Sequence, residues 1–151
     1  MRRFMILAMM TVSHAAASAT PKTTYLARCS MCHQANAQGL PGQFPRLAGR
    51  SAQIAQTAEG RSYMISTVLH GMYGSITVDS QPITGLMPSM AAMTDAEIAD
   101  ALNFVITVGK SAKAAAPFKP TEITAVRTGP KVSGSQNAEL RQNLVTSGTI
   151  K

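Results

Sequence analysis

The residues Cys29-Ser-Met-Cys-His33 constrain this chain more than any other feature, because they have the C-x-x-C-H spacing of a c-type haem attachment site. Two thiols three positions apart can each bond to one vinyl group of a haem, and the histidine that follows can bind the iron. The chain has 2 cysteines in all, so one macrocycle would use both. The motif therefore predicts a single covalent haem c, attached through Cys29 and Cys32, with His33 as an iron ligand.

A C-x-x-C pair has two other uses, a redox dithiol and part of a zinc site. A redox dithiol is expected within a βαβ pattern, whereas the sequence around Cys29 has the pattern of helix and loop. A structural zinc ion needs four protein ligands, and beyond the motif the chain offers only His14 and His70. We expect His14 to be removed with the N-terminal segment, so haem is the favoured interpretation.

Residues 1–19 have the pattern of a signal peptide. A charged start precedes an apolar run over residues 4–12, and Ala17-Ser-Ala19 has the small-x-small form of a cleavage site. The apolar run is shorter than the roughly 20 residues that a membrane-spanning helix needs. We expect export to the periplasm, cleavage near Ala19, and no stable membrane span. Since bacteria attach haem c outside the cytoplasmic membrane, export and the haem motif support each other.

The basic charge of the chain belongs to its C-terminal part. The formal net charge is +7, and residues 1–19 contribute two arginines to it. Residues 20–109 carry five basic and five acidic side chains, whereas residues 110–151 carry seven basic and two acidic ones. The chain has no basic stripe among aromatic residues, so we expect no nucleic-acid partner.

Apolar spacing and capping signals predict an all-α domain over residues 20–109. A capping box of Thr94 and Glu97 begins its clearest helix, and Gly109 ends it. Gly71 is the expected end of the preceding helix. The first two expected helices cover residues 22–32 and 61–70, and long loops are expected over residues 34–49 and 72–93.

Residues 110–151 form the expected C-terminal extension. Residues 111–120 have the composition of a linker, and helical turns are expected over residues 121–127 and 137–145. This extension is either a solvated or packing strap on the haem domain or a basic docking arm for an acidic partner. Both interpretations stay open.

The second axial ligand of the iron has several candidates. Met87 lies just before the last helix of the domain, in Gly85-Leu-Met-Pro88, where the proline fixes the backbone and the glycine permits close approach to the macrocycle. Position alone favours Met87. Other side chains with a suitable donor atom remain candidates: Met90, Met93 and His70.

The chain resembles a small class I cytochrome c, of the periplasmic monohaem type found beside or fused to bacterial dehydrogenases. Three segments carry the resemblance in the order of the family: the haem motif, the G-L-P-G-Q-F-P-R-L-A-G run over residues 39–49, and G-L-M-P over residues 85–88 with T-D-A-E-I-A after it. The resemblance implies a small cytochrome c fold with helices around one haem. Here that fold would carry a short C-terminal extension.

The resemblance also implies roles for two residues. Met87 would be the distal iron ligand, and Pro45 would accept a hydrogen bond from the ring of His33. Two departures from the family pattern matter. Pro21 stands in the neighbourhood where a glycine usually permits the first and last helices to cross, and Met90 stands where an aromatic residue usually follows M-P. The second departure keeps Met90 open as a competing ligand.

An iron ligated by His33 and Met87 has both axial positions filled, so it can pass electrons but offers no position for a substrate. We therefore expect an electron carrier and not an enzyme by itself, with a dehydrogenase as donor and an oxidase or reductase as acceptor. Two alternatives stay open. One is a haem enzyme or ligand sensor with an open sixth position, and the other is a non-haem protein that uses Cys29 and Cys32.

Overall fold

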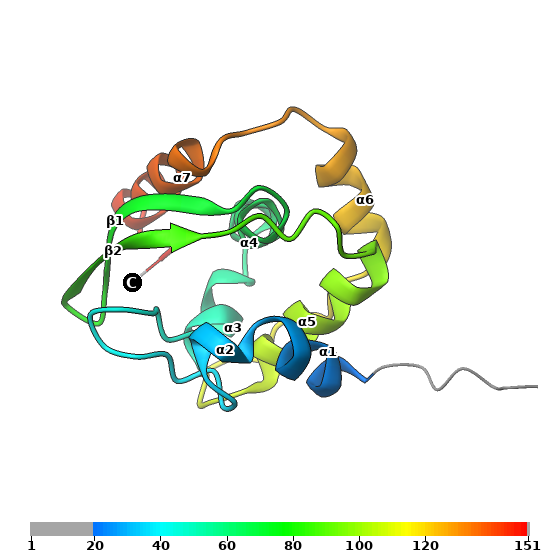
Figure 1. The fold of residues 1–151 in the computed structure, drawn as a ribbon, viewed down its shortest axis with the longest axis horizontal. Helices are drawn as coiled ribbons and strands as arrows, with labels where there is room; N and C mark the ends of the chain where they lie inside the picture. Colours follow the sequence, from blue (N-terminus) through cyan, green and yellow to red (C-terminus); the bar gives the residue numbers. More distant parts are fainter. Residues whose placement is uncertain (1–19, 151) are drawn as a thin grey trace, which may run out of the picture.

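The computed structural model describes residues 20–150, which form seven helices and one two-stranded sheet (Figure 1). The predicted signal segment, residues 1–19, lies outside the described residues. Within the described part of the chain, the longest helices are too short to span a bilayer. In chain order the elements are α1 (Pro21–Arg28), α2 (Ser30–His33), α3 (Arg50–Ile54), α4 (Ala58–His70), β1 (Met72–Val78), β2 (Gln81–Met87), α5 (Asp95–Thr107), α6 (Pro120–Thr128) and α7 (Gly134–Thr146).

Helix α1 packs against α5 and carries the haem motif at its C-terminal end. The Tyr25 side chain is fully buried, and its ring lies 4.5 Å from the ring of Phe104 on α5, centroid to centroid. The Tyr25 hydroxyl donates a hydrogen bond of 2.7 Å to the Gln34 carbonyl. Pro21 occupies the first turn, where a missing N–H costs nothing. The helix expected over residues 22–32 is thus two helices, separated at Cys29.

The N-terminal signal of α5 and the C-terminal signal of α4 act as expected, whereas α5 ends at Thr107, two residues before Gly109. The Thr94 hydroxyl accepts a hydrogen bond from the backbone N–H of Glu97, and the Thr94 N–H donates to the Glu97 carboxylate. Helix α4 ends at Gly71, which has a positive φ of 76°. It begins at Ala58, three residues before its expected start, because the Thr57 hydroxyl caps the N–H of Gly60.

The loop predicted over residues 72–93 is wrong in its first part, because residues 72–87 form an antiparallel hairpin. Met72 pairs with Met87 at its base, and the two-residue turn at its tip has positive φ angles at Asp79 (52°) and Ser80 (62°). This turn matches the right-handed twist of strands. Pro82 suggested a loop, but both strands of a two-stranded sheet are edges, where proline is tolerated.

The C-terminal extension folds back onto the rest of the chain. Helix α6 packs against α4 and α5, and α7 packs against α4 and β1 (Figure 1). Both helices are longer than expected. The extension contributes four almost fully buried apolar side chains to the common core: Phe118, Ile123, Leu144 and Ile150. Residues 110–150 are therefore a packed part of the structure.

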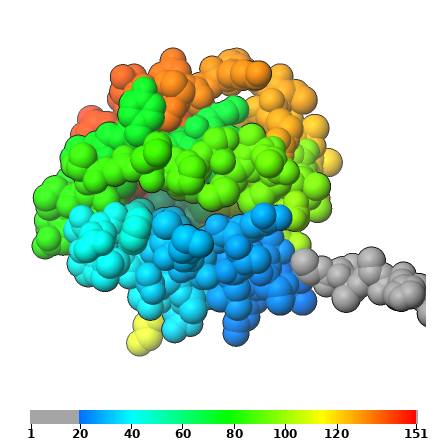
Figure 2. Space-filling model, viewed as in Figure 1, coloured from blue at the N-terminus to red at the C-terminus, as the bar shows by residue number. Residues whose placement is uncertain are grey.

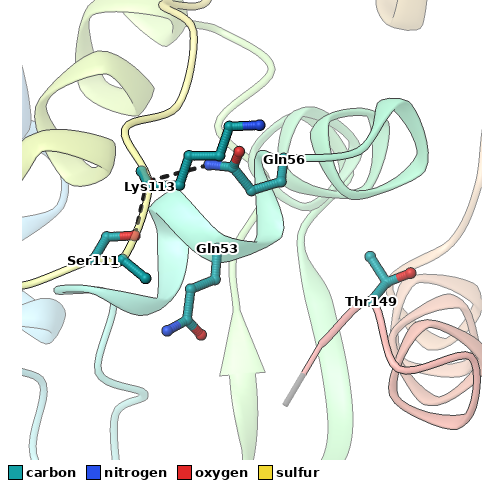
Figure 3. A pocket seen from close by; sticks show the side chains of 6 residues that line it. Gln53, Gln56, Ser111, Lys113 and Thr149 are labelled. Atoms are coloured by element: carbon teal, nitrogen blue, oxygen red, sulfur yellow. Dashed lines mark hydrogen bonds between the residues drawn. The ribbon is translucent and has the colours of Figure 1, made fainter.

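A hollow of about 260 Å³ lies where α3, the linker and the last described residues of the chain meet (Figure 3). The Lys113 carbonyl accepts hydrogen bonds from the Gln56 amide and the Ser111 hydroxyl there. Gln53, Ala112 and Thr149 also line it. None of the haem-motif residues lines this hollow, so it is separate from the candidate site.

Two ion pairs join the extension to the helices beneath it. Arg61 Nη2 lies 2.8 Å from Glu122 Oε2, and Arg127 Nε lies 2.7 Å from Asp95 Oδ1. The hydrogen bonds from Arg61 lower the pKa of Glu122, and those from Thr124 and Arg127 lower the pKa of Asp95. Both carboxylates are thus stabilised in their charged form by folding.

These depressed pKa values predict a loss of stability in acid. A carboxylate whose pKa is lower in the folded protein stabilises it fully above the unfolded pKa of about 4, and this contribution disappears as the pH falls through the folded pKa. We therefore expect the contribution of these two carboxylates to the free energy of unfolding to be constant from neutral pH to about pH 5. It should fall below about pH 4. Urea unfolding at a series of pH values measures this. Asp95→Asn should show a shallower acid slope, and an unchanged slope would contradict the prediction.

Candidate haem site

The two thiols of the haem motif lie at the junction of α1 and α2. Cys29 caps the C-terminus of α1, and its carbonyl accepts hydrogen bonds from the N–H groups of Cys32 (3.3 Å) and His33 (3.0 Å). This single turn brings the three side chains onto one short stretch of backbone. Both thiols are free and partly buried, and burial raises the pKa of Cys29 to about 11. Cys29 is therefore a neutral thiol at pH 7.

The imidazole of His33 is held by one hydrogen bond. Its Nδ1 atom lies 2.9 Å from the Pro45 carbonyl oxygen, and because a carbonyl only accepts, Nδ1 carries the proton. The His33 residue is 8 % exposed, and this burial lowers its pKa. Among residues 20–150, no hydrogen bond involves its Nε2 atom. His33 is thus a neutral imidazole with a lone pair on Nε2, the form that binds a metal.

A compact loop places the Pro45 carbonyl against His33. Gly39 has a φ of +66°, and a Cβ atom there would lie 2.5 Å from the Phe44 carbonyl oxygen, so the loop closes only with glycine at this position. The N–H groups of Leu47 and Ala48 both donate to the carbonyl of the fully buried Ala37. These bonds hold the segment that follows Pro45 against the buried Ala37.

Met87 is the last residue of β2, and it is half-buried and packed against the core. It thus ends a strand, and the loop begins at Pro88. The backbone of Gly71 lies against it, since a Cβ atom on Gly71 would be 2.5 Å from the Met87 carbonyl oxygen. Three residues on, the N–H of Met90 donates to the Val68 carbonyl at 2.8 Å. Helix α4 and the Gly71 that ends it therefore support the backbone from Met87 to Met90.

The other candidate ligands have different surroundings. Met93 is 5 % exposed and Met90 is half-buried, and both pack against the core. His70 is half-buried at the end of α4, and its Nε2 atom is buried without a hydrogen-bond partner among the described residues.

A hollow separates the two halves of the candidate site. In the face shown in Figure 2, it lies between the blue and cyan N-terminal segment and the green segment that contains the hairpin. Figure 1 places α2 on one side and β2 on the other. The thiols and His33 belong to the first side, and Met87 belongs to the second. Two thiols, an imidazole and a thioether are the donors that a c-type haem requires, so the residues present fit this group.

Positive charge gathers beside the Pro45 loop, which sequence reasoning did not find. Arg46 donates two hydrogen bonds to Asp79, at 2.7 and 2.8 Å, and Arg50 donates a third at 3.2 Å. Arg141 is 6 % exposed and close enough to Arg50 that, after desolvation, its charge lowers the pKa of Arg50. Two guanidinium groups thus share one carboxylate, and a third lies close to them. This excess of positive charge suits an anionic group such as a haem propionate.

Comparison with known proteins identifies the family of this chain. Residues 18–109 match the family model described as Cytochrome c. Cytochrome c-552 of Thermus thermophilus is 45% identical over 94 residues, which are 62% of this chain and 72% of that protein. A second cytochrome c-552 from Thermus thermophilus is also 45% identical over 94 residues, and there the matched part is 64% of that protein.

A more distant relative belongs to an enzyme complex. The cytochrome c subunit of a quinone alcohol dehydrogenase from Gluconacetobacter polyoxogenes is 30% identical over 122 residues, which are 79% of this chain. The matched part is 25% of that subunit. The family match spans the haem motif, the Pro45 loop, Met87 and α5. The chain therefore belongs to the class I c-type cytochromes, and its cofactor is covalently bound haem c.

Proposed function

We propose that this cytochrome c carries electrons in the periplasm through one haem c, bound to Cys29 and Cys32 and ligated by His33 and Met87. The observation that supports this most strongly is the state of His33. Its Nδ1 is committed to the Pro45 carbonyl and its Nε2 is free to bind iron. Met87 ends β2, which Figure 1 places across from α2.

The residues around the haem set its electronic properties. When bound, the haem supplies an iron that changes between the ferrous and ferric states. The Pro45 carbonyl fixes the orientation of His33 and increases its electron donation. The thioether of Met87 is neutral, which favours the ferrous state and raises the reduction potential. Because the two side chains would fill both axial positions, we propose an electron carrier without an enzymatic activity of its own.

We also propose an organisation of the chain around this site. Residues 1–19 would direct export and be cleaved near Ala19, residues 20–109 would form the haem domain, and residues 110–151 would be an extension. The signal pattern of the N-terminus supports the first boundary. The end of the family match at residue 109 supports the second.

Redox proteins are the proposed partners. A dehydrogenase would donate electrons, and an oxidase or reductase would accept them. A relative that is the cytochrome c subunit of a quinone alcohol dehydrogenase supports the first of these. The balanced charge of residues 20–109 predicts weak electrostatic steering at the haem site, so the rate of association should depend little on salt.

The visible spectrum of the full-length protein, produced together with a cytochrome c maturation system, tests the proposal. We expect sharp α and β bands in the reduced form, as for a low-spin haem. In the oxidised form we expect the weak red band that methionine-ligated ferric haem c shows. A double variant, Cys29→Ser with Cys32→Ser, is the control and should release its haem on acid extraction.

Two other spectra would contradict the proposal. High-spin bands that shift when an external ligand is added would favour the enzyme or sensor with an open sixth position. Absence of any Soret band, with an intact fold, would favour the non-haem use of Cys29 and Cys32.

A further inference from the structure

We infer that the C-terminal extension positions the distal ligand, because it holds both ends of the segment that carries Met87. We call residues 71–95 the ligand segment, since they contain the hairpin, Met87 and the loop to α5. The inference rests on the proposed function, in which Met87 binds the iron. It assigns Asn137 and Arg127 as positioning residues that act through the backbone of this segment.

Asn137 of α7 holds the first end of the ligand segment. Its side chain is 0 % exposed, and its Nδ2 donates hydrogen bonds of 2.7 Å to the Gly71 carbonyl and 3.2 Å to the Ser66 carbonyl. The Ser66 hydroxyl donates to its Oδ1 at 2.7 Å. The backbone of Gly71 in turn abuts the Met87 carbonyl. Asn137 therefore fixes the backbone against which Met87 rests.

Helix α7 also supports the strand that pairs with Met87. Gly134 sits so close to β1 that a Cβ atom there would lie 2.8 Å from the Tyr73 ring and 3.2 Å from the Met72 Cα. Near the hairpin tip, Arg141 donates to the Thr77 carbonyl at 3.1 Å. Because Met72 pairs with Met87, the intact hairpin can leave the core only if β1 also leaves α7.

Arg127 of α6 holds the second end of the ligand segment. Its guanidinium donates hydrogen bonds to the carbonyls of Ala91 (2.8 Å) and Met93 (2.7 Å) and to the Asp95 carboxylate (2.7 Å). Charge-assisted bonds of this kind are stronger than neutral ones. One side chain from the extension thus binds the loop that follows Met87 at two carbonyls and the first residue of α5 at its carboxylate.

A segment held at both ends opens rarely, and an external ligand can replace Met87 only when it opens. The extension should therefore slow the exchange of this ligand. If the extension only stabilised the whole fold, breaking any contact between it and the haem domain would change the rate of ligand exchange to a similar degree. Arg61 provides the comparison, since it donates to Glu122 and to the carbonyls of Ala116 and Pro117 but to nothing in the ligand segment.

The experiment compares Arg127→Ala with Arg61→Ala in full-length holoprotein. Imidazole is added to the oxidised protein, and the loss of the red methionine band gives the rate of replacement of Met87. We expect Arg127→Ala to raise this rate by about tenfold or more, because three charge-assisted bonds to the ligand segment are lost. We expect Arg61→Ala to change it by less than about twofold, although urea unfolding should show both variants to be destabilised. If either alanine variant fails to yield holoprotein, Arg127→Gln and Arg61→Gln provide the same contrast.

Two results would overturn the inference. Equal acceleration by the Arg127 and Arg61 variants would mean that the extension stabilises the whole fold without a specific effect on Met87. An unchanged rate in the Arg127 variant would mean that its contacts do not restrain the ligand segment. Failure of the proposed function is distinguishable from both, because the unmodified protein would then lack the methionine band, and the inference would fall with it.

Discussion

Replacing Met87 with alanine should remove the red band of the oxidised protein and lower the reduction potential by on the order of 100 mV, a fraction of the ~0.8 V over which axial ligands set haem potentials. The physical reason is the loss of a neutral thioether, which favours the ferrous state, and the entry of water, which favours the ferric state. A fall of about 100 mV changes the one-electron equilibrium about fifty-fold. Potentiometric titration of the purified holoprotein, followed by its visible spectrum, measures this shift.

Met90→Ala is the matched control for this prediction. Met90 is the same residue type, lies three positions further along, and is also half-buried. Its hydrogen bond to the Val68 carbonyl comes from the backbone, so alanine retains it. We expect this variant to keep the red band and nearly the same potential. Loss of the band in Met90→Ala, with its retention in Met87→Ala, would show that the ligand assignment is wrong.

The elements that could be predicted from the sequence are those with local signals. The capping box joins Thr94 and Glu97, which are three positions apart, and it begins α5 where the pattern predicted. Gly71 is a local signal too, and it ends α4 where the sequence predicted. The contact between His33 and Pro45 joins residues 12 apart, and family resemblance was needed to expect it, because composition and periodicity carry no signal for such a pair.

Contacts between distant residues explain what was missed. Arg46 and Asp79 lie 33 positions apart, and their pairing depends on a hairpin whose glycine and proline residues had indicated a loop. Asn137 and Gly71 lie 66 positions apart. In the sequence, Asn137 stands in a polar stretch that is typical of an exposed helix, and only the fold shows that α4 and β1 surround it. Burial of a polar residue is a tertiary property, so the sequence alone left the role of the extension open.

Asn137→Ala should be the most destabilising alanine substitution of a polar residue in the extension, at about 3 kcal/mol. Alanine leaves the carbonyls of Gly71 and Ser66 and the Ser66 hydroxyl without the partner that they have in the folded protein. Each unsatisfied buried group costs about 1–3 kcal/mol, and partial entry of water reduces the sum. For a chain of this size we expect a fall in Tm of roughly 10 °C. Urea unfolding of the holoprotein, followed by circular dichroism, measures the change.

Two further variants determine which bonds of Asn137 matter. Asn143 is exposed on the same helix, so Asn143→Ala should change stability by less than about 0.5 kcal/mol, and a loss equal to that of Asn137→Ala would contradict the prediction. Asn137→Asp keeps the size of the side chain and an oxygen that can accept from Ser66, but it loses both N–H donors. Because a buried carboxylate would face the carbonyls of Gly71 and Ser66, we expect this variant to be at least as unstable as alanine. If it is instead nearly as stable as the unmodified protein, the bond from Ser66 carries the energy, and the hold of Asn137 on Gly71 is weak.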